Sequence, residues 1–244
     1  MASVIIDTSS WIELAKPKFH KILNELIELV NNGKIEILSN IILNDEWNRN
    51  KERTINTIKE SIRNYAKSAS KIEGLVEQED KDKLRSVLLK YKEVEKEQIN
   101  LAESHFEKIN NLLENATAIS ISDGLKIKMA DRAVNKKAPF HNTKNNMADA
   151  LIIFSAIDWV NENKLIQQDL LFVSGNHAEF SNPEDINQVH TEIAQYSNKA
   201  TLYFTNNIGR IIALKEAHVE DEETEAEIQL WNHIEWEAEI RRGK

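Results

Sequence analysis

The sequence predicts an α/β fold in which a parallel β-sheet is flanked by helices on both faces. Short apolar runs bounded by polar residues are typical of buried strands, and in this chain they alternate with longer segments of helical periodicity. The expected strands are the segments SVIID, KIEILSN, ATAISISDG, DLLFVS and TLYFT. Alternation of this kind favours parallel strands, because a strand rejoins its sheet in the same direction only through a crossover such as a helix.

The helices expected between these strands follow from apolar spacing and from the residues at their ends. Apolar side chains recur at helical spacing over residues 19–31, and Gly33 ends that helix because glycine adopts the left-handed cap conformation at little cost. A helix that carries Glu46 is expected to begin after Asn40 or Asn44. Further helices are expected over residues 123–134, 148–160, 183–196 and 206–213.

Residues 48 to about 115 are predicted to form a long helical hairpin inserted into this fold. The segment contains one glycine, Gly74, and no proline, and an apolar stripe lies on each side of that glycine. Two long antiparallel helices account best for this pattern. Such a hairpin could cap an active site, clamp a substrate or pair with another subunit, and the sequence does not choose among these roles.

The distribution of charge separates the chain into a main domain, residues 1–215, and an acidic C-terminal helix or tail, residues 216–244. The tail holds ten Asp and Glu and no Lys or Arg between Glu216 and Glu239, so removing this −10 from the total of −9 leaves about +1 for the rest.

A basic strip between residues 123 and 146 is predicted to contact a nucleic-acid backbone. It has six basic residues against two Asp, a local balance of +4. A solvated helix face is the alternative. The members of the basic strip are Lys126, Lys128, Arg132, Lys136, Lys137 and Lys144.

Composition excludes several other classes of protein. At 244 residues the chain is long enough for one sizeable core. No window approaches the roughly 20 apolar residues that a membrane span requires, and no basic segment precedes the first strand, so we expect no membrane partner and no signal peptide. The absence of cysteine excludes disulfides and thiolate metal sites. A cytoplasmic location fits these features.

Polar residues far apart in the chain occur where an α/β fold would direct them to one spot. Asp7 ends the first apolar run, Glu46 lies near the start of a helix, Asp149 begins a strongly apolar helix, and Asn176 and Glu179 follow a strand. Carboxylates gathered in a crevice repel one another unless a hard cation joins them, and Mg²⁺ or Mn²⁺ is the usual cation. The constellation therefore predicts metal-dependent phosphodiester hydrolysis.

Each of these residues also has an ordinary structural interpretation. Asp7 could cap the following helix, and Asp149 could interact favourably with the dipole at a helix start. Glu46 could simply face solvent. Asn176 follows a glycine and could belong to a plain turn.

The order and spacing of these motifs together resemble those of the PIN-domain nucleases. The matching segments are VIIDTSSWI, SNIILNDEW, NNMADALII and LFVSGNHAEFS, and the resemblance covers about residues 1–47 and 118–212. The long hairpin and the segment KKAPFHNTKNNMADALI resemble a larger, PIN-like subgroup of that family. The resemblance implies a PIN-like, Rossmann-like arrangement of the sheet.

The resemblance also implies roles for the acidic residues. Catalytic roles are implied for Asp7, Glu46, Asp149 and Glu179. One or two Mg²⁺ or Mn²⁺ ions would be held by Asp7, Glu46, Asp149 and Asn176. The family often has Asp where this chain has Asn176, so the number of metal ions is left open.

Hydrolysis of single-stranded or looped RNA, with 5′-phosphate and 3′-hydroxyl products, is what the resemblance implies, and RNA is favoured over DNA. Thr8 or Ser10 would orient a ligand or contact a phosphate oxygen. A toxin or a phage-defence effector is a role that the family implies. The partner is left open, and it could be an antitoxin, another protein or a second copy of the chain.

Three alternatives remain at this stage. A catalytically weak, PIN-like scaffold or binding module is favoured by Asn176 and opposed by the retained acids. A DNA-directed nuclease would use the same residues. A small phosphatase would use carboxylates too, but the chain has no glycine-rich phosphate loop, and Asp7 is followed by Thr8 and Ser9, so the Asp-x-Asp pair of an aspartyl-phosphate enzyme is missing there.

Overall fold

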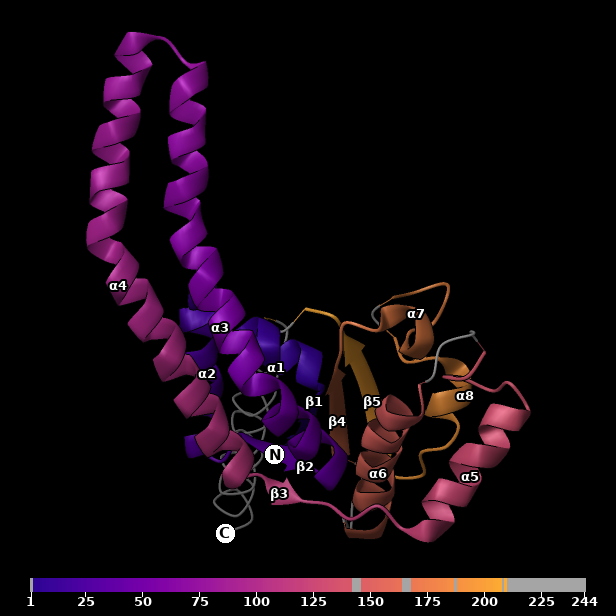
Figure 1. The fold of residues 1–244 in the computed structure, drawn as a ribbon. Helices are drawn as coiled ribbons and strands as arrows, with labels where there is room; N and C mark the ends of the chain where they lie inside the picture. The colour runs from indigo at the N-terminus through magenta and orange to yellow at the C-terminus, as the bar shows by residue number, and fades with distance from the viewer. Residues whose placement is uncertain (1, 142–145, 164–167, 187, 208, 210–244) are drawn as a thin grey trace, which may run out of the picture. The chain divides into compact units, whose positions relative to one another are not determined.

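In the computed structural model, five parallel strands form one sheet in the order β3-β2-β1-β4-β5 (Figure 1). The order reverses between β1 and β4, where Ile6 pairs with Val173. In open α/β sheets, ligands bind in the crevice outside the carboxyl ends of the strands at such a reversal. The predicted fold class is confirmed. The strands are β1 (Ala2–Ile6), β2 (Ile35–Ser39), β3 (Thr117–Ala118), β4 (Gln168–Val173) and β5 (Ala200–Thr205).

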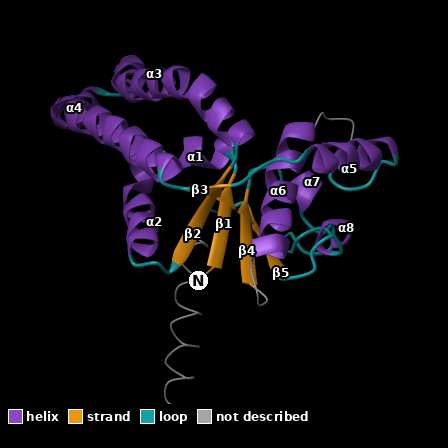
Figure 2. Ribbon diagram, turned by 90° about the horizontal axis from the view of Figure 1, so that it is seen from below, coloured by secondary structure: helices purple, strands orange, loops and turns teal. Residues whose placement is uncertain are grey.

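Helices cover both faces of this sheet, with α2 and α4 on one side and α5 and α6 on the other (Figure 2). Helices α2 and α4 contact β2, whereas α6 contacts β1, β4 and β5. A short 3-10 segment, η1 (Pro17–Phe19), precedes α2, and a second, η2 (Glu73–Leu75), joins α3 to α4. The helices are α1 (Thr8–Leu14), α2 (His20–Asn31), α3 (Ile41–Ile72), α4 (Gln78–Glu114), α5 (Asp123–Val134), α6 (Met147–Asn163), α7 (His177–Phe180) and α8 (Thr191–Ala194).

One part of the core lies between the sheet and α6. Every residue of β1 is buried, and the run 150–157 of α6 is buried without interruption. A helix that is apolar on nearly all sides is expected to be enclosed by other elements, and this packing fixes the position of the first turn of α6. Among the helices of the described segments, none is both long enough and apolar enough to span a membrane.

The structure describes residues 2–141, 146–163, 168–186, 188–207 and 209. The chain divides into two units, Met1–Ile208 and Gly209–Lys244. The predicted acidic tail, Lys144 of the basic strip and most of the helix expected over 206–213 lie outside the described residues.

Helices α3 and α4 form the predicted antiparallel hairpin (Figure 1). Helix α3 begins directly after Asn40, whose Oδ1 accepts a hydrogen bond from the Leu43 backbone N–H at 3.0 Å. Glu46 therefore lies in the second turn of the same continuous helix that forms one arm of the hairpin. The end of α4 belongs to the core, since Phe106, Ile109 and Leu113 are buried.

Trp47 joins the two arms where the hairpin meets the sheet. Its indole is 2% exposed, stacks on Phe106 with 5.3 Å between ring centroids, and donates a hydrogen bond from Nε1 to Asn110 Oδ1 at 2.7 Å. Replacing Trp47 with phenylalanine is expected to lower the free energy of unfolding by about 1–2 kcal/mol, because the hydrogen bond to Asn110 and part of the packed side-chain volume are both lost. Urea denaturation measures this effect. Leu75→Ala, at an 85% exposed position, should change the free energy of unfolding by no more than about 0.5 kcal/mol.

The helix expected over residues 183–196 is a wrong prediction, since the described residues of this range are helical only in α8 (Thr191–Ala194). Asn182 Oδ1 accepts a hydrogen bond from the Glu184 N–H at 3.0 Å, which makes a local turn in place of a helical one. Ser181 and Val189 then form an isolated antiparallel bridge. Asparagine followed by proline favours a turn, and the helix prediction from apolar spacing did not weigh this signal.

Candidate active site

Asp7 lies at the carboxyl end of β1 and is 5% exposed. Its backbone N–H donates to Val173 O at 2.9 Å, which fixes it beside the end of β4. Although Asp7 occupies the position before α1, its carboxylate makes no capping bond. Its Oδ2 instead accepts hydrogen bonds from Ser9 Oγ at 2.5 Å and Ser174 Oγ at 3.2 Å. Two hydroxyl groups thus hold the side chain beside the carboxyl ends of β1 and β4.

Glu46 approaches the same region from α3. Thr8 Oγ1 donates a hydrogen bond to Glu46 Oε2 at 3.1 Å, so the first residue of α1 holds a carboxylate from a helix 38 residues further along the chain. Thr8 is itself 1% exposed. The side chain of Glu46 is therefore oriented toward the N-terminus of α1.

Asp149 lies in the first turn of α6 and is paired with Asn176, which follows β4. Asn176 Nδ2 donates a hydrogen bond to Asp149 Oδ2 at 2.7 Å, and the Asn176 backbone N–H donates to Ser174 Oγ at 3.1 Å. Because Ser174 in turn donates to Asp7, a continuous chain of hydrogen bonds joins the two aspartates. Asn176 serves here as a donor to a carboxylate, whereas the sequence suggested an oxygen ligand.

The electrostatics of Asp149 show that the four acids share one region. Burial raises the pKa of Asp149 to about 6, the charges of Asp7, Glu46 and Glu179 raise it too, and the hydrogen bond from Asn176 opposes them. Glu179 is 2% exposed in α7. The structure therefore brings Asp7, Glu46 and Glu179 near Asp149, and the catalytic and metal-binding roles expected of these four residues stay predictions. We call this group the carboxylate cluster.

The hydroxyl groups near the carboxylate cluster differ in part from those expected. Thr8 orients Glu46, whereas Ser10 is a buried residue of α1, and it is Ser9 that contacts Asp7. Ser174 was missed by sequence reasoning. The signal available for it was a small polar residue directly after a buried strand that neighbours β1.

The donor atoms of the carboxylate cluster fit a hard divalent cation. Carboxylate oxygens are the ligands that Mg²⁺ and Mn²⁺ prefer, and the repulsion around Asp149 is what a cation would relieve. In the side-chain arrangement described, no three His, Asp or Glu side chains are placed to enclose an ion. The residues that would hold a cation are Asp7, Glu46 and Asp149, with Asn176 positioning Asp149.

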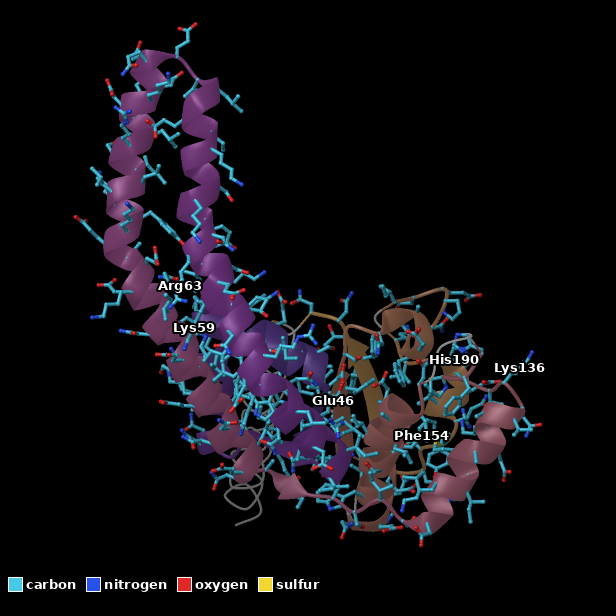
Figure 3. The ribbon with its side chains drawn as sticks, in the orientation of Figure 1. Glu46, Lys59, Arg63, Lys136, Phe154 and His190 are labelled. Atoms are coloured by element: carbon cyan, nitrogen blue, oxygen red, sulfur yellow. The ribbon has the colours of Figure 1, made fainter. Side chains whose placement is uncertain are left out.

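One member of the basic strip, Lys136, lies apart from the carboxylate cluster. Figure 3 shows it just past the end of α5, well away from Glu46 on α3. Lys126 forms an ion pair with Asp123 at 2.8 Å, and Lys128 Nζ donates to the Tyr196 hydroxyl at 3.3 Å. Lys136 and Lys137, which follow α5, are exposed. Contact of each with a nucleic-acid backbone stays a prediction.

Arg132 differs from the other members of the basic strip because its guanidinium is half-buried. Nε and Nη2 both donate to Ala138 O, Nη2 also donates to Glu192 O, and the group stacks on the Phe154 ring at 4.9 Å. Arg132→Gln is expected to lower the free energy of unfolding by about 1–3 kcal/mol, since buried carbonyl groups lose their donors. Lys136→Gln should change the free energy of unfolding by no more than about 0.5 kcal/mol. Urea denaturation of both variants checks this contrast.

The protein has a parallel α/β sheet with four carboxylates near the point where the strand order reverses. This combination defines a class of proteins with an acidic site of oxygen donors. Within this class the chain belongs to the PIN-domain family, because a family model described as PIN domain matches residues 4–180. PIN domains are generally nucleases. Searches of curated proteins and of solved structures returned no match.

Proposed function

We propose that the protein is a metal-dependent endoribonuclease that hydrolyses phosphodiester bonds at the carboxylate cluster. The observation that carries this proposal is the convergence of Asp7, Glu46, Asp149 and Glu179 beside the carboxyl ends of β1 and β4. Four acids in one region repel one another, and folding tolerates this arrangement at a cost in stability. A site that must hold a cation accounts for that cost.

The residues of the cluster have separate tasks in this proposal. Asp7, Glu46 and Asp149 hold the cation, while Ser174 and Asn176 keep Asp7 and Asp149 oriented through their hydrogen bonds. A bound Mg²⁺ or Mn²⁺ supplies stabilisation of the charge that develops on the phosphoryl oxygens and lowers the pKa of an attacking water. No nucleophilic side chain is needed for this reaction.

The substrate is proposed to be single-stranded or looped RNA. Lys136 and Lys137 are exposed, and together with Lys126 and Lys128 they offer charge to a phosphate backbone without reading bases. A cytoplasmic toxin or phage-defence effector, with an antitoxin or a second copy as partner, is consistent with this activity.

The test is cleavage of end-labelled single-stranded RNA and DNA of one sequence, with Mg²⁺, Mn²⁺ or EDTA. We expect RNA to be cut in the presence of either metal, with 5′-phosphate and 3′-hydroxyl products, and EDTA to stop the reaction. Preferential cutting of DNA would show that DNA, and not RNA, is the substrate. Metal-independent cutting would contradict the proposed chemistry.

A binding module without turnover is the second candidate, and the observation that favours it is the amide of Asn176. The amide donates to Asp149 where the family often has another acid, so the cluster has one charge fewer. The same assay separates the two functions, because a binding module would retain RNA in EDTA and in metal without cutting it.

A further inference from the structure

A cavity of about 590 Å³ lies where the hairpin meets the segment that follows α1, and we call it the hairpin-base pocket. Its walls come from α3, α4 and η1, and a volume of this size is typical of small-molecule sites. Its lining includes Lys16, Lys18, Thr57, Ser61, Tyr65 and Tyr91. None of them belongs to the carboxylate cluster.

Two neighbouring helices connect the carboxylate cluster with the hairpin-base pocket. Helix α1 contacts α3, Thr8 bonds to Glu46 at one end, and Lys16 and Thr57 line the pocket at the other. The 11 positions from Glu46 to Thr57 correspond to about 16 Å along α3. A strand of a few linked nucleotides can cover that distance.

The connecting face of α3 is polar. Glu46, Asn50, Arg53, Thr57 and Ser61 follow one another at intervals of three or four residues, which places them on one side of the helix. Figure 3 shows Glu46 near the start of α3, with Lys59 farther along the same helix. A hydrophilic track therefore leads from the cluster toward the pocket.

The pocket contains an aromatic pair, of which one ring is fixed and the other is open. The Tyr91 hydroxyl donates to Ile62 O at 2.6 Å, which holds its ring in place. Tyr65 packs against it edge to face, with centroids 6.4 Å apart and planes at 82°, yet remains 63% exposed. An exposed aromatic ring on a rigid support is the usual platform for a stacked nucleobase.

The rim of the pocket is weakly basic. Lys16 and Lys18 both form ion pairs with Glu13, the latter at 3.0 Å, so these three side chains carry a net charge of +1. A positive rim beside an aromatic ring suits a base together with the phosphate attached to it.

We propose that the hairpin-base pocket is a subsite for single-stranded nucleic acid, in which a nucleobase stacks on Tyr65 while Lys16 and Lys18 contact the adjoining phosphates. This inference rests on the proposed function for the identity of the ligand as nucleic acid. It assigns the hairpin the role of holding the substrate strand at a distance from the carboxylate cluster.

The test measures binding of two fluorescein-labelled 15-mers in EDTA, where no cutting interferes. One is oligouridylate, and the other is an abasic phosphodiester that keeps only the backbone. Tyr65→Ala is expected to bind the oligouridylate roughly five- to tenfold more weakly and the abasic strand unchanged, because only the first can stack. Tyr65→Phe should retain wild-type binding. Lys16→Gln should weaken both strands.

Leu89→Ala is the matched control, since Leu89 is an exposed apolar residue of α4 outside the pocket, and it should bind like the wild type. Equal losses on both strands for Tyr65→Ala, wild-type binding by that variant, or no binding by the wild-type protein would each overturn the subsite. In those cases an apolar segment of a protein partner becomes the better occupant. A Tyr65-dependent preference for bases without any metal-dependent cutting would overturn the nuclease alone.

Discussion

Replacing Asp149 with asparagine is expected to reduce metal-dependent RNA cleavage by about a hundred- to a thousandfold in a protein that remains folded. The substitution keeps the size of the side chain and an oxygen that can accept the hydrogen bond from Asn176 Nδ2. It removes the negative charge by which Asp149 would hold a cation. Single-turnover cleavage of end-labelled RNA in Mn²⁺ measures the loss.

Two further variants show whether the loss is specific to this site. Asp131→Asn alters an exposed aspartate of α5 and should leave the rate unchanged. Asn176→Ala removes a group that positions Asp149, so we expect a smaller loss, about ten- to a hundredfold, that higher Mn²⁺ partly restores. Wild-type cleavage by Asp149→Asn would show that the carboxylate cluster is not the active site.

Much of the fold could be predicted because its strands are short apolar runs with abrupt polar ends. Alternation with helices then indicated a parallel sheet, and the hairpin followed from long apolar stripes interrupted only at Gly74. What the pattern could not reveal is the continuity of α3, in which one helix carries both Glu46 and an arm of the hairpin. The helix expected over 183–196 failed because local hydrogen bonds of Asn182 outweighed the apolar spacing.

The acidic members of the site were predictable for a related reason. Asp7 ends a strand, and Asp149 begins a buried helix, so the fold class alone directs both toward the order reversal of the sheet. The contacts between them were not predictable, since Ser174 joins them only because β1 and β4 are neighbours. The direction of the Asn176 amide depends on the position of Asp149 and has no signal in the sequence.

The same substitution, Asp149→Asn, is expected to stabilise the metal-free protein at neutral pH by about 1–2 kcal/mol, a figure reduced for solvent screening of a partly exposed group. Burial, with the neighbouring acids, raises the pKa of Asp149 to about 6 from a usual value of 3.8. Between these values the folded state binds more protons than the unfolded state, so stability falls as pH rises. The contribution of Asp149 is fully present below pH 4 and is lost as the pH passes 6.

Urea denaturation of both proteins from pH 4 to pH 8, in EDTA and in Mn²⁺, tests this linkage. In EDTA the variant should gain on the wild type as pH rises, because asparagine has no charge to bury. In Mn²⁺ at a hundred times its dissociation constant, the wild type should gain about 2.7 kcal/mol and the variant much less. A difference between the two proteins that stays constant across the pH range would show that Asp149 ionises freely. The cluster would then carry none of the repulsion that a cation is proposed to relieve.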